Sequence, residues 1–153
     1  MDITIHSRKS AEEIIRSNLL KNIAVISFYD PESRHDADYA PVNYKGKCAR
    51  YIGICVRDID IEILGDYGLT YDTYLPEANE IAKFILSAAN DGLDFICQCE
   101  YGQSRSAACA AAIKEYFNHS GIEIFADYRY YPNQLVFNKI LNALKDCGGY
   151  NNV

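Results

Sequence analysis

Cys99 and Arg105 are the residues whose type and spacing point most directly to chemistry, and the five residues Glu-Tyr-Gly-Gln-Ser lie between them. An apolar, β-prone stretch (DFICQ, residues 94–98) precedes Cys99, and an alanine-rich stretch of high helix propensity follows Arg105. A loop that joins a strand to a helix can curl until its backbone N–H groups point at one centre, and Gly102 provides backbone freedom for this. We expect these donors and the helix dipole to hold a tetrahedral phosphate.

Each of the surrounding side chains has a distinct role in such a loop. Arg105 can donate a bidentate pair of hydrogen bonds to two phosphate oxygens. A free cysteine is only a few per cent thiolate at neutral pH, so we expect the same donors to stabilise the Cys99 thiolate for attack on phosphorus. Ser106 could donate its hydroxyl to the sulfur when that sulfur leaves. The predicted substrate-binding residues are Glu100, Tyr101, Gly102, Gln103, Ser104 and Arg105, with Tyr101 at the pocket mouth.

The stretch FICQCEYGQSRSAACAAAI resembles the active-site signature of the cysteine-dependent protein phosphatases, Cys-x5-Arg followed by Ser or Thr, in its dual-specificity-like form. The bare spacing also occurs by chance in many proteins, but here the strand, the glycine, the serine and the helix accompany it. The resemblance implies that Cys99 is the nucleophile, that Arg105 binds phosphate, and that Ser106 assists breakdown of the cysteinyl-phosphate. PNQLVFNKILNAL similarly resembles the last helix of small bacterial members.

A general acid is also implied by the resemblance, because YIGICVRD is similar to the strand and loop that carry the family's aspartic acid. Asp58 matches that position and is the first candidate. Asp60 and Asp66 lie in the same long loop and remain alternatives. The same group must be protonated to release the alcohol and deprotonated to activate water, which predicts a bell-shaped pH profile.

One position departs from the family pattern. Members usually have His immediately before the nucleophile, whereas this chain has Gln98, which can hydrogen-bond to the loop backbone but carries no titratable charge.

Two of the other cysteines admit a redox interpretation. Residues i and i+2 of a strand share a face, so Cys97 could capture a sulfenic acid at Cys99 as a disulfide, although a buried small side chain is the favoured interpretation. A zinc site built from Cys48, Cys55, Cys97 and Cys99 lacks any repeated Cys-x2-Cys unit. We therefore expect neither a metal nor a cofactor.

The elements that must position these residues alternate between strands and helices. Strands are predicted at residues 2–6, 22–29, 51–56 and 94–98. Helices are predicted after the capping-box pair Ser10 and Glu13, over residues 75–89, after Arg105, and from Asn133 onward. This order predicts an α/β fold in which helices flank a central, mostly parallel sheet.

Composition limits the classes of partner. A chain of 153 residues fits a single domain, residues 1–153, and 49% hydrophobic residues are typical of a globular protein. A net charge of -6 without a basic block argues against nucleic acid and anionic membranes. The N-terminal sequence lacks the features of a secretory signal, and no stretch is long and apolar enough to span a bilayer. We expect a cytoplasmic monomer with reduced cysteines.

These observations predict a phosphomonoester hydrolase of the tyrosine or dual-specificity type, acting on a phosphorylated protein or a small phosphomonoester. The acidity of the chain and of Glu100 argues against polyanionic substrates. Two alternatives remain: a catalytically weak phosphate-binding module with the same loop, and a sulfurtransferase-like enzyme that uses the same thiolate.

Overall fold

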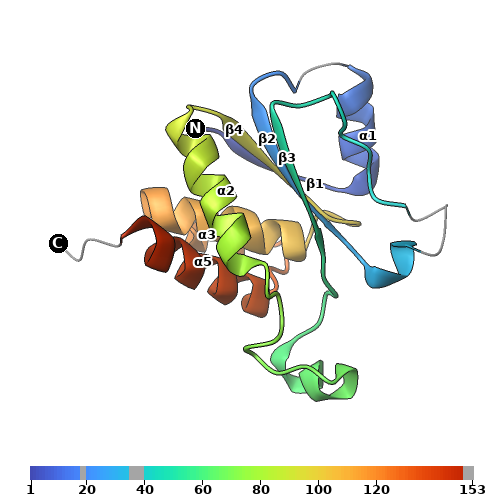
Figure 1. The fold of residues 1–153 in the computed structure, drawn as a ribbon, viewed down its shortest axis with the longest axis vertical. Helices are drawn as coiled ribbons and strands as arrows, with labels where there is room; N and C mark the ends of the chain where they lie inside the picture. Colours follow the sequence, from blue (N-terminus) through green and yellow to red (C-terminus); the bar gives the residue numbers. More distant parts are fainter. Residues whose placement is uncertain (18–19, 35–39, 150–153) are drawn as a thin grey trace.

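Four parallel strands form the centre of the computed structural model, which describes residues 1–17, 20–34 and 40–149 (Figure 1). They are β1 (Ile3–His6), β2 (Ile23–Tyr29), β3 (Arg50–Cys55) and β4 (Asp94–Gln98), in the sheet order β1-β4-β2-β3. Every pairing among them is parallel, as the alternation of strands and helices predicted. Because parallel strands all end at one edge, the segments that follow β2, β3 and β4 converge there.

Helices cover both faces of the sheet (Figure 1). On one face lie α2 (Ala78–Asn90), α3 (Arg105–Asn118) and α5 (Gln134–Gly148), and on the other lies α1 (Arg8–Arg16). A short α4 (Ile122–Phe125) follows α3, and the 3-10 helices η1 (Pro31–Arg34) and η3 (Ile61–Tyr67) follow β2 and β3. Among the helices of the described ranges, none has the length and apolar character that crossing a bilayer requires.

Side chains of β2 alternate between two hydrophobic cores. Ala24, Ile26 and Phe28 pack into the larger core under α2, α3 and α5, whereas Val25 faces the smaller core under α1. Alanines fill the buried length of α3, and their small size lets this helix lie close to both the sheet and α5. The N-terminus of α3 is therefore held in place by packing on several sides.

Two predicted helix starts are wrong by a few residues. Helix α1 begins at Arg8 because Ser7, rather than Ser10, has the extended backbone of an N-cap, and its side chain accepts a hydrogen bond from the Ser10 N–H. Helix α2 begins at Ala78 rather than at Leu75, because Leu75 has a φ of 51°, outside the right-handed helical region.

Candidate active site

The backbone of the 99–105 loop is turned so that its carbonyls point outward. Three loop carbonyls accept hydrogen bonds from N–H groups outside the loop: Glu100 from Arg8 at 3.0 Å, Gln103 from Tyr131 at 2.9 Å, and Ser104 from Asn133 at 3.2 Å. Across the described part of the chain, no hydrogen bond is donated by the backbone N–H groups of residues 100 to 105. A run of unpaired N–H groups at the start of a helix is the arrangement that binds anions.

Gly102 holds this loop against the junction of β1 and α1. Its φ is 69°, and a Cβ atom here would lie 2.6 Å from the Ser7 nitrogen and 2.8 Å from the His6 carbonyl carbon. An ion pair joins the same two segments, since Arg8 Nε lies 2.8 Å from Glu100 Oε2. The curled shape of the loop therefore depends on a close backbone contact that only glycine permits.

The Cys99 sulfur lies 3.0 Å from the Ser106 hydroxyl oxygen. Cys99 is only 2% exposed, yet it lines a cavity of about 260 Å³. The residues that line this cavity are Asp58, Cys99, Tyr101, Gln103, Ser104, Arg105 and Tyr131. We call this cavity the Cys99 pocket. Cys99 therefore lines a small pocket together with an arginine and an aspartate.

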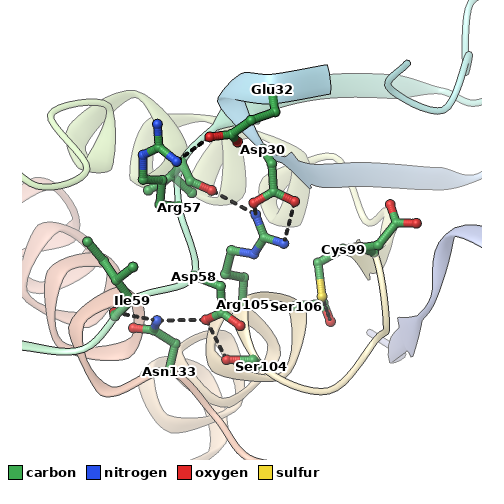
Figure 2. Close-up of polar contacts among 12 residues, drawn as sticks. Asp30, Glu32, Arg57, Asp58, Ile59, Cys99, Ser104, Arg105, Ser106 and Asn133 are labelled. Carbon is green, nitrogen blue, oxygen red and sulfur yellow. Dashed lines mark hydrogen bonds and ion pairs between the residues drawn. The ribbon is translucent and has the colours of Figure 1, made fainter. Parts of the chain in front are cut away.

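Arg105 is 4% exposed, and two of its nitrogens are held by groups outside the loop (Figure 2). Its Nη1 donates to the Val56 carbonyl at 2.7 Å and to Asp30 Oδ1 at 2.9 Å, and its Nη2 lies 3.4 Å from Asp30 Oδ2. Its Nε is buried and has no hydrogen-bond partner among the described residues. An unpaired buried donor is costly, so an oxyanion in the pocket would supply an acceptor that Nε lacks.

Asp58 follows β3 and reaches across to the 99–105 loop. Its Oδ1 accepts hydrogen bonds from Ser104 Oγ at 2.7 Å and from Asn133 Nδ2 at 2.9 Å (Figure 2). Asp60 instead caps η3 by accepting from the Glu62 N–H, and Asp66 is exposed within η3. Neither of these two residues lines the Cys99 pocket, so Asp58 is the candidate acid that the fold brings to the cysteine.

Tyr74 supports the backbone next to this acid. Its side chain is buried, and its hydroxyl donates to the Arg57 carbonyl at 2.7 Å. Burial, followed by the negative charge of Asp58, raises the pKa of Tyr74 above its usual range. The phenol therefore stays protonated and keeps donating at neutral pH.

Gln98, at the position where the resemblance leads one to expect His, is buried and hydrogen-bonded through both of its side-chain polar atoms. Its Oε1 accepts from the hydroxyls of Ser27 at 2.6 Å and Tyr44 at 2.8 Å, and its Nε2 donates to the Cys99 carbonyl at 3.0 Å. Burial raises the pKa of Tyr44, which keeps this phenol a donor. A neutral amide thus supports the backbone of the nucleophile without adding a charge.

The other predicted substrate-binding residues are placed differently from one another. Tyr101, Gln103 and Ser104 line the Cys99 pocket, whereas the Glu100 side chain turns to Arg8 and Gly102 packs on the β1–α1 junction. The last two can therefore contribute to the pocket only through their backbone.

Cys97 has a partner other than Cys99. It neighbours Cys109 of α3, and burial, followed by this contact with Cys97, raises the pKa of Cys109 well above its ordinary value. Within the described ranges, no three His, Cys, Asp or Glu side chains cluster as metal ligands would.

Two residues at this site, Asp30 and Asn133, were not recognised from the sequence. Asp30 directly follows the strand predicted at residues 22–29, and its place at the carboxyl end of β2 puts it at the same edge of the sheet as Cys99. Asn133 was interpreted only as the start of a helix, and it is indeed the N-cap of α5. Its side-chain oxygen makes the cap, while its nitrogen reaches Asp58 and the Ile59 carbonyl.

No family model matches the chain, and no curated protein sequence is similar to it. Solved structures do match over nearly the full length. The structure of PTPMT1 in complex with PI(5)P has a TM-score of 0.60 at 12% identity and covers 96% of this chain and 92% of its own. A human tyrosine phosphatase-like serine/threonine/tyrosine-interacting protein has a TM-score of 0.58 at 14% identity, with coverages of 92% and 89%. Human DUSP28 has a TM-score of 0.56 at 13% identity, with coverages of 95% and 93%. The chain therefore has the fold of the tyrosine and dual-specificity phosphatases.

Proposed function

We propose that this protein hydrolyses phosphomonoesters through a cysteinyl-phosphate intermediate on Cys99. The observation that carries the proposal is the run of backbone N–H groups of residues 100 to 105, directly after β4, which, like the buried Nε of Arg105, have no hydrogen-bond partner among the described residues. These donors match the equatorial oxygens of a phosphoryl group in transfer, where preorganised hydrogen bonds are worth most.

The reaction divides into two steps. In the first, the Cys99 thiolate forms a bond to phosphorus as the bond to the ester oxygen breaks, and Asp58 gives its proton to the departing alkoxide or phenoxide. In the second, Asp58 accepts a proton from water as that water attacks phosphorus, and the Cys99 sulfur leaves. Ser106, 3.0 Å from the sulfur, donates a hydrogen bond that stabilises the departing thiolate.

Asp58 is the observation that favours turnover over phosphate binding alone. Its carboxylate lines the Cys99 pocket and is held there by Ser104 and Asn133. A module that only binds phosphate gains nothing from a carboxylate at this place, because the negative charge repels the ligand.

Hydrolysis of para-nitrophenyl phosphate with and without vanadate tests the proposal. Wild type should release nitrophenol and be inhibited by vanadate, and Cys99→Ser should lose this activity. Cys147→Ser is the matched control, because Cys147 is exposed near the end of α5. Equal turnover by wild type and Cys99→Ser would exclude the cysteine mechanism, and activity with thiosulfate instead of the phosphate ester would favour sulfur transfer.

The role of Asp58 requires a separate measurement. Asp58→Asn should slow hydrolysis of alkyl phosphates far more than that of activated aryl phosphates, because a nitrophenolate leaves without a proton. Asp66→Asn, on η3 but outside the Cys99 pocket, is the control. Wild-type rates of Asp58→Asn on both substrates would remove Asp58 from the mechanism.

A further inference from the structure

A second cavity, of about 500 Å³, adjoins the Cys99 pocket. The two cavities share Asp58, Ser104 and Tyr131, and the second extends between η3 and the N-terminus of α5. A substrate whose phosphate lies over Cys99 must project the rest of its structure past this shared wall. The part of the substrate next to the phosphoryl group is therefore the natural occupant of the second cavity.

The walls of the second cavity carry negative charge. Carboxylates of Asp58, Asp60 and Glu62 line it, and none of its described lining residues is Lys or Arg. The Glu62 side chain has no hydrogen bond or ion pair within the described ranges, while Asp60 uses one oxygen to cap η3. Such a wall favours a cationic group and disfavours a second anion.

Two cationic residues that neighbour lining residues in the sequence, Arg57 and Lys139, already have partners within the protein. Arg57 forms an ion pair with Glu32, and Lys139 donates to the carbonyls of Tyr71 and Asp72. The N-terminus of α5 adds about half a positive charge, which the carboxylates of Asp60 and Glu62 outweigh even while Asp58 carries the proton that it donates in the first step.

Tyrosine rings complete the chemistry of the cavity. Tyr71 and Tyr131 both line it, and both are exposed. The Tyr71 ring already faces Lys139, whose Nζ lies 5.0 Å from the ring centroid, so Tyr131 is the ring offered to an incoming cation. Aromatic faces attract ammonium and guanidinium groups and also pack against the aliphatic stems of Lys and Arg. Asn138 and Gln134 add amides that can pair with a polypeptide backbone.

We propose that the second cavity binds a Lys or Arg side chain beside the phosphorylated residue of a polypeptide substrate. This inference rests on the proposed function only in that the phosphate must occupy the Cys99 pocket. It commits the enzyme to basic phosphorylated segments rather than acidic ones.

Matched phosphotyrosine peptides test the preference. Three peptides of equal length should carry Lys, Gln or Glu on both sides of the phosphotyrosine. We expect kcat/KM to be about fivefold higher for the Lys peptide than for the Gln peptide, the size expected of exposed ion pairs, and lowest for the Glu peptide. The preference should shrink as salt is added. Equal values for the three peptides would overturn the proposal.

Removal of the negative charges of the second cavity tests whether these charges cause the preference for the Lys peptide. In Asp60→Asn/Glu62→Gln the new Asn side chain can still cap η3 while both charges are gone, and the Lys-to-Gln ratio should fall toward one. Glu13→Gln/Glu80→Gln is the matched control, because it removes the same charge from residues that do not line the cavity. A ratio that persists in the first variant, or falls equally in the second, would count against the cavity.

Binding to Cys99→Ser, measured by calorimetry, separates this inference from the proposed hydrolysis. Tighter binding of the Lys peptide without any turnover by wild type would support the charge preference of the second cavity and refute the proposed hydrolysis. Turnover without a charge preference would do the reverse. Failure to bind or hydrolyse any of the peptides would overturn this inference alone, because hydrolysis of para-nitrophenyl phosphate decides the proposed function independently.

Discussion

Replacement of Gly102 by alanine tests the claim that the 99–105 loop is held in its curled shape by a close backbone contact. The new Cβ atom would lie 2.6 Å from the Ser7 nitrogen and 2.8 Å from the His6 carbonyl carbon, which are backbone atoms that cannot rotate away. The φ of 69° adds the cost of a left-handed conformation for a residue with a side chain.

The two costs can be separated with a matched glycine. Gly92, between α2 and β4, has a φ of 74° and no heavy atom within 4 Å of the position a Cβ would take. Gly92→Ala should therefore cost only the backbone term, about 1 kcal/mol. Gly102→Ala should cost that amount plus about 1–3 kcal/mol for the steric displacement, so roughly 2–4 kcal/mol in total.

Equilibrium unfolding in urea measures both costs, and hydrolysis of para-nitrophenyl phosphate reports on the loop. Gly102→Ala should lose most activity even where it remains folded, because displacement of the loop moves the N–H groups that face the phosphate. Gly92→Ala should keep wild-type kinetics. Equal destabilisation of the two variants, or full activity of Gly102→Ala, would refute the claim that this contact shapes the loop.

Three further predictions concern the surroundings of the loop. Asp30→Ala leaves the Arg105 guanidinium with only the Val56 carbonyl as a hydrogen-bond acceptor, so kcat/KM for para-nitrophenyl phosphate should fall about tenfold. Asp30→Glu should retain part of the wild-type kcat/KM. Unchanged kinetics in Asp30→Ala would show that Asp30 does not orient the guanidinium. Gln98→Leu removes the buried hydrogen-bond partner of the Ser27 and Tyr44 hydroxyls and of the Cys99 carbonyl, so the free energy of unfolding in urea should decrease by about 3 kcal/mol or more. A decrease of less than about 1 kcal/mol would contradict the importance of these hydrogen bonds. Burial lowers the pKa of His6 below 6.5, so just below this pH the unfolded chain binds a proton that the folded chain does not. The free energy of unfolding should therefore keep its full His6 contribution above about pH 6.5 and fall below that pH, less steeply in His6→Gln. Parallel plots of this free energy against pH for the two proteins would contradict the prediction.

The parallel α/β arrangement could be predicted from the sequence because its signals are local. Runs such as residues 22–29 are apolar on both faces, and the helical segments between strands show their own periodicity. The exact helix starts could not, since Leu75 satisfies the helical pattern and yet takes a positive φ imposed by its surroundings. The candidate phosphate loop could be proposed for the same reason as the strands, because its cysteine, glycine and arginine lie within seven consecutive residues.

Residue types and spacing alone therefore predicted the class of fold, which the structure confirms, and named Cys99 and Arg105 as the candidate nucleophile and phosphate-binding residue, since each of these inferences depends on neighbours within a few positions. Only the tertiary structure shows which of the three aspartates lines a pocket with Cys99, because Asp58, Asp60 and Asp66 lie close together in the sequence and differ mainly in where the fold places them. The same holds for Asp30 and Asn133, whose partners lie 75 residues away in the chain and meet them only when parallel strands end at one edge of the sheet. Long-range contacts of this kind follow from the packing of the whole chain, so local sequence patterns do not predict them.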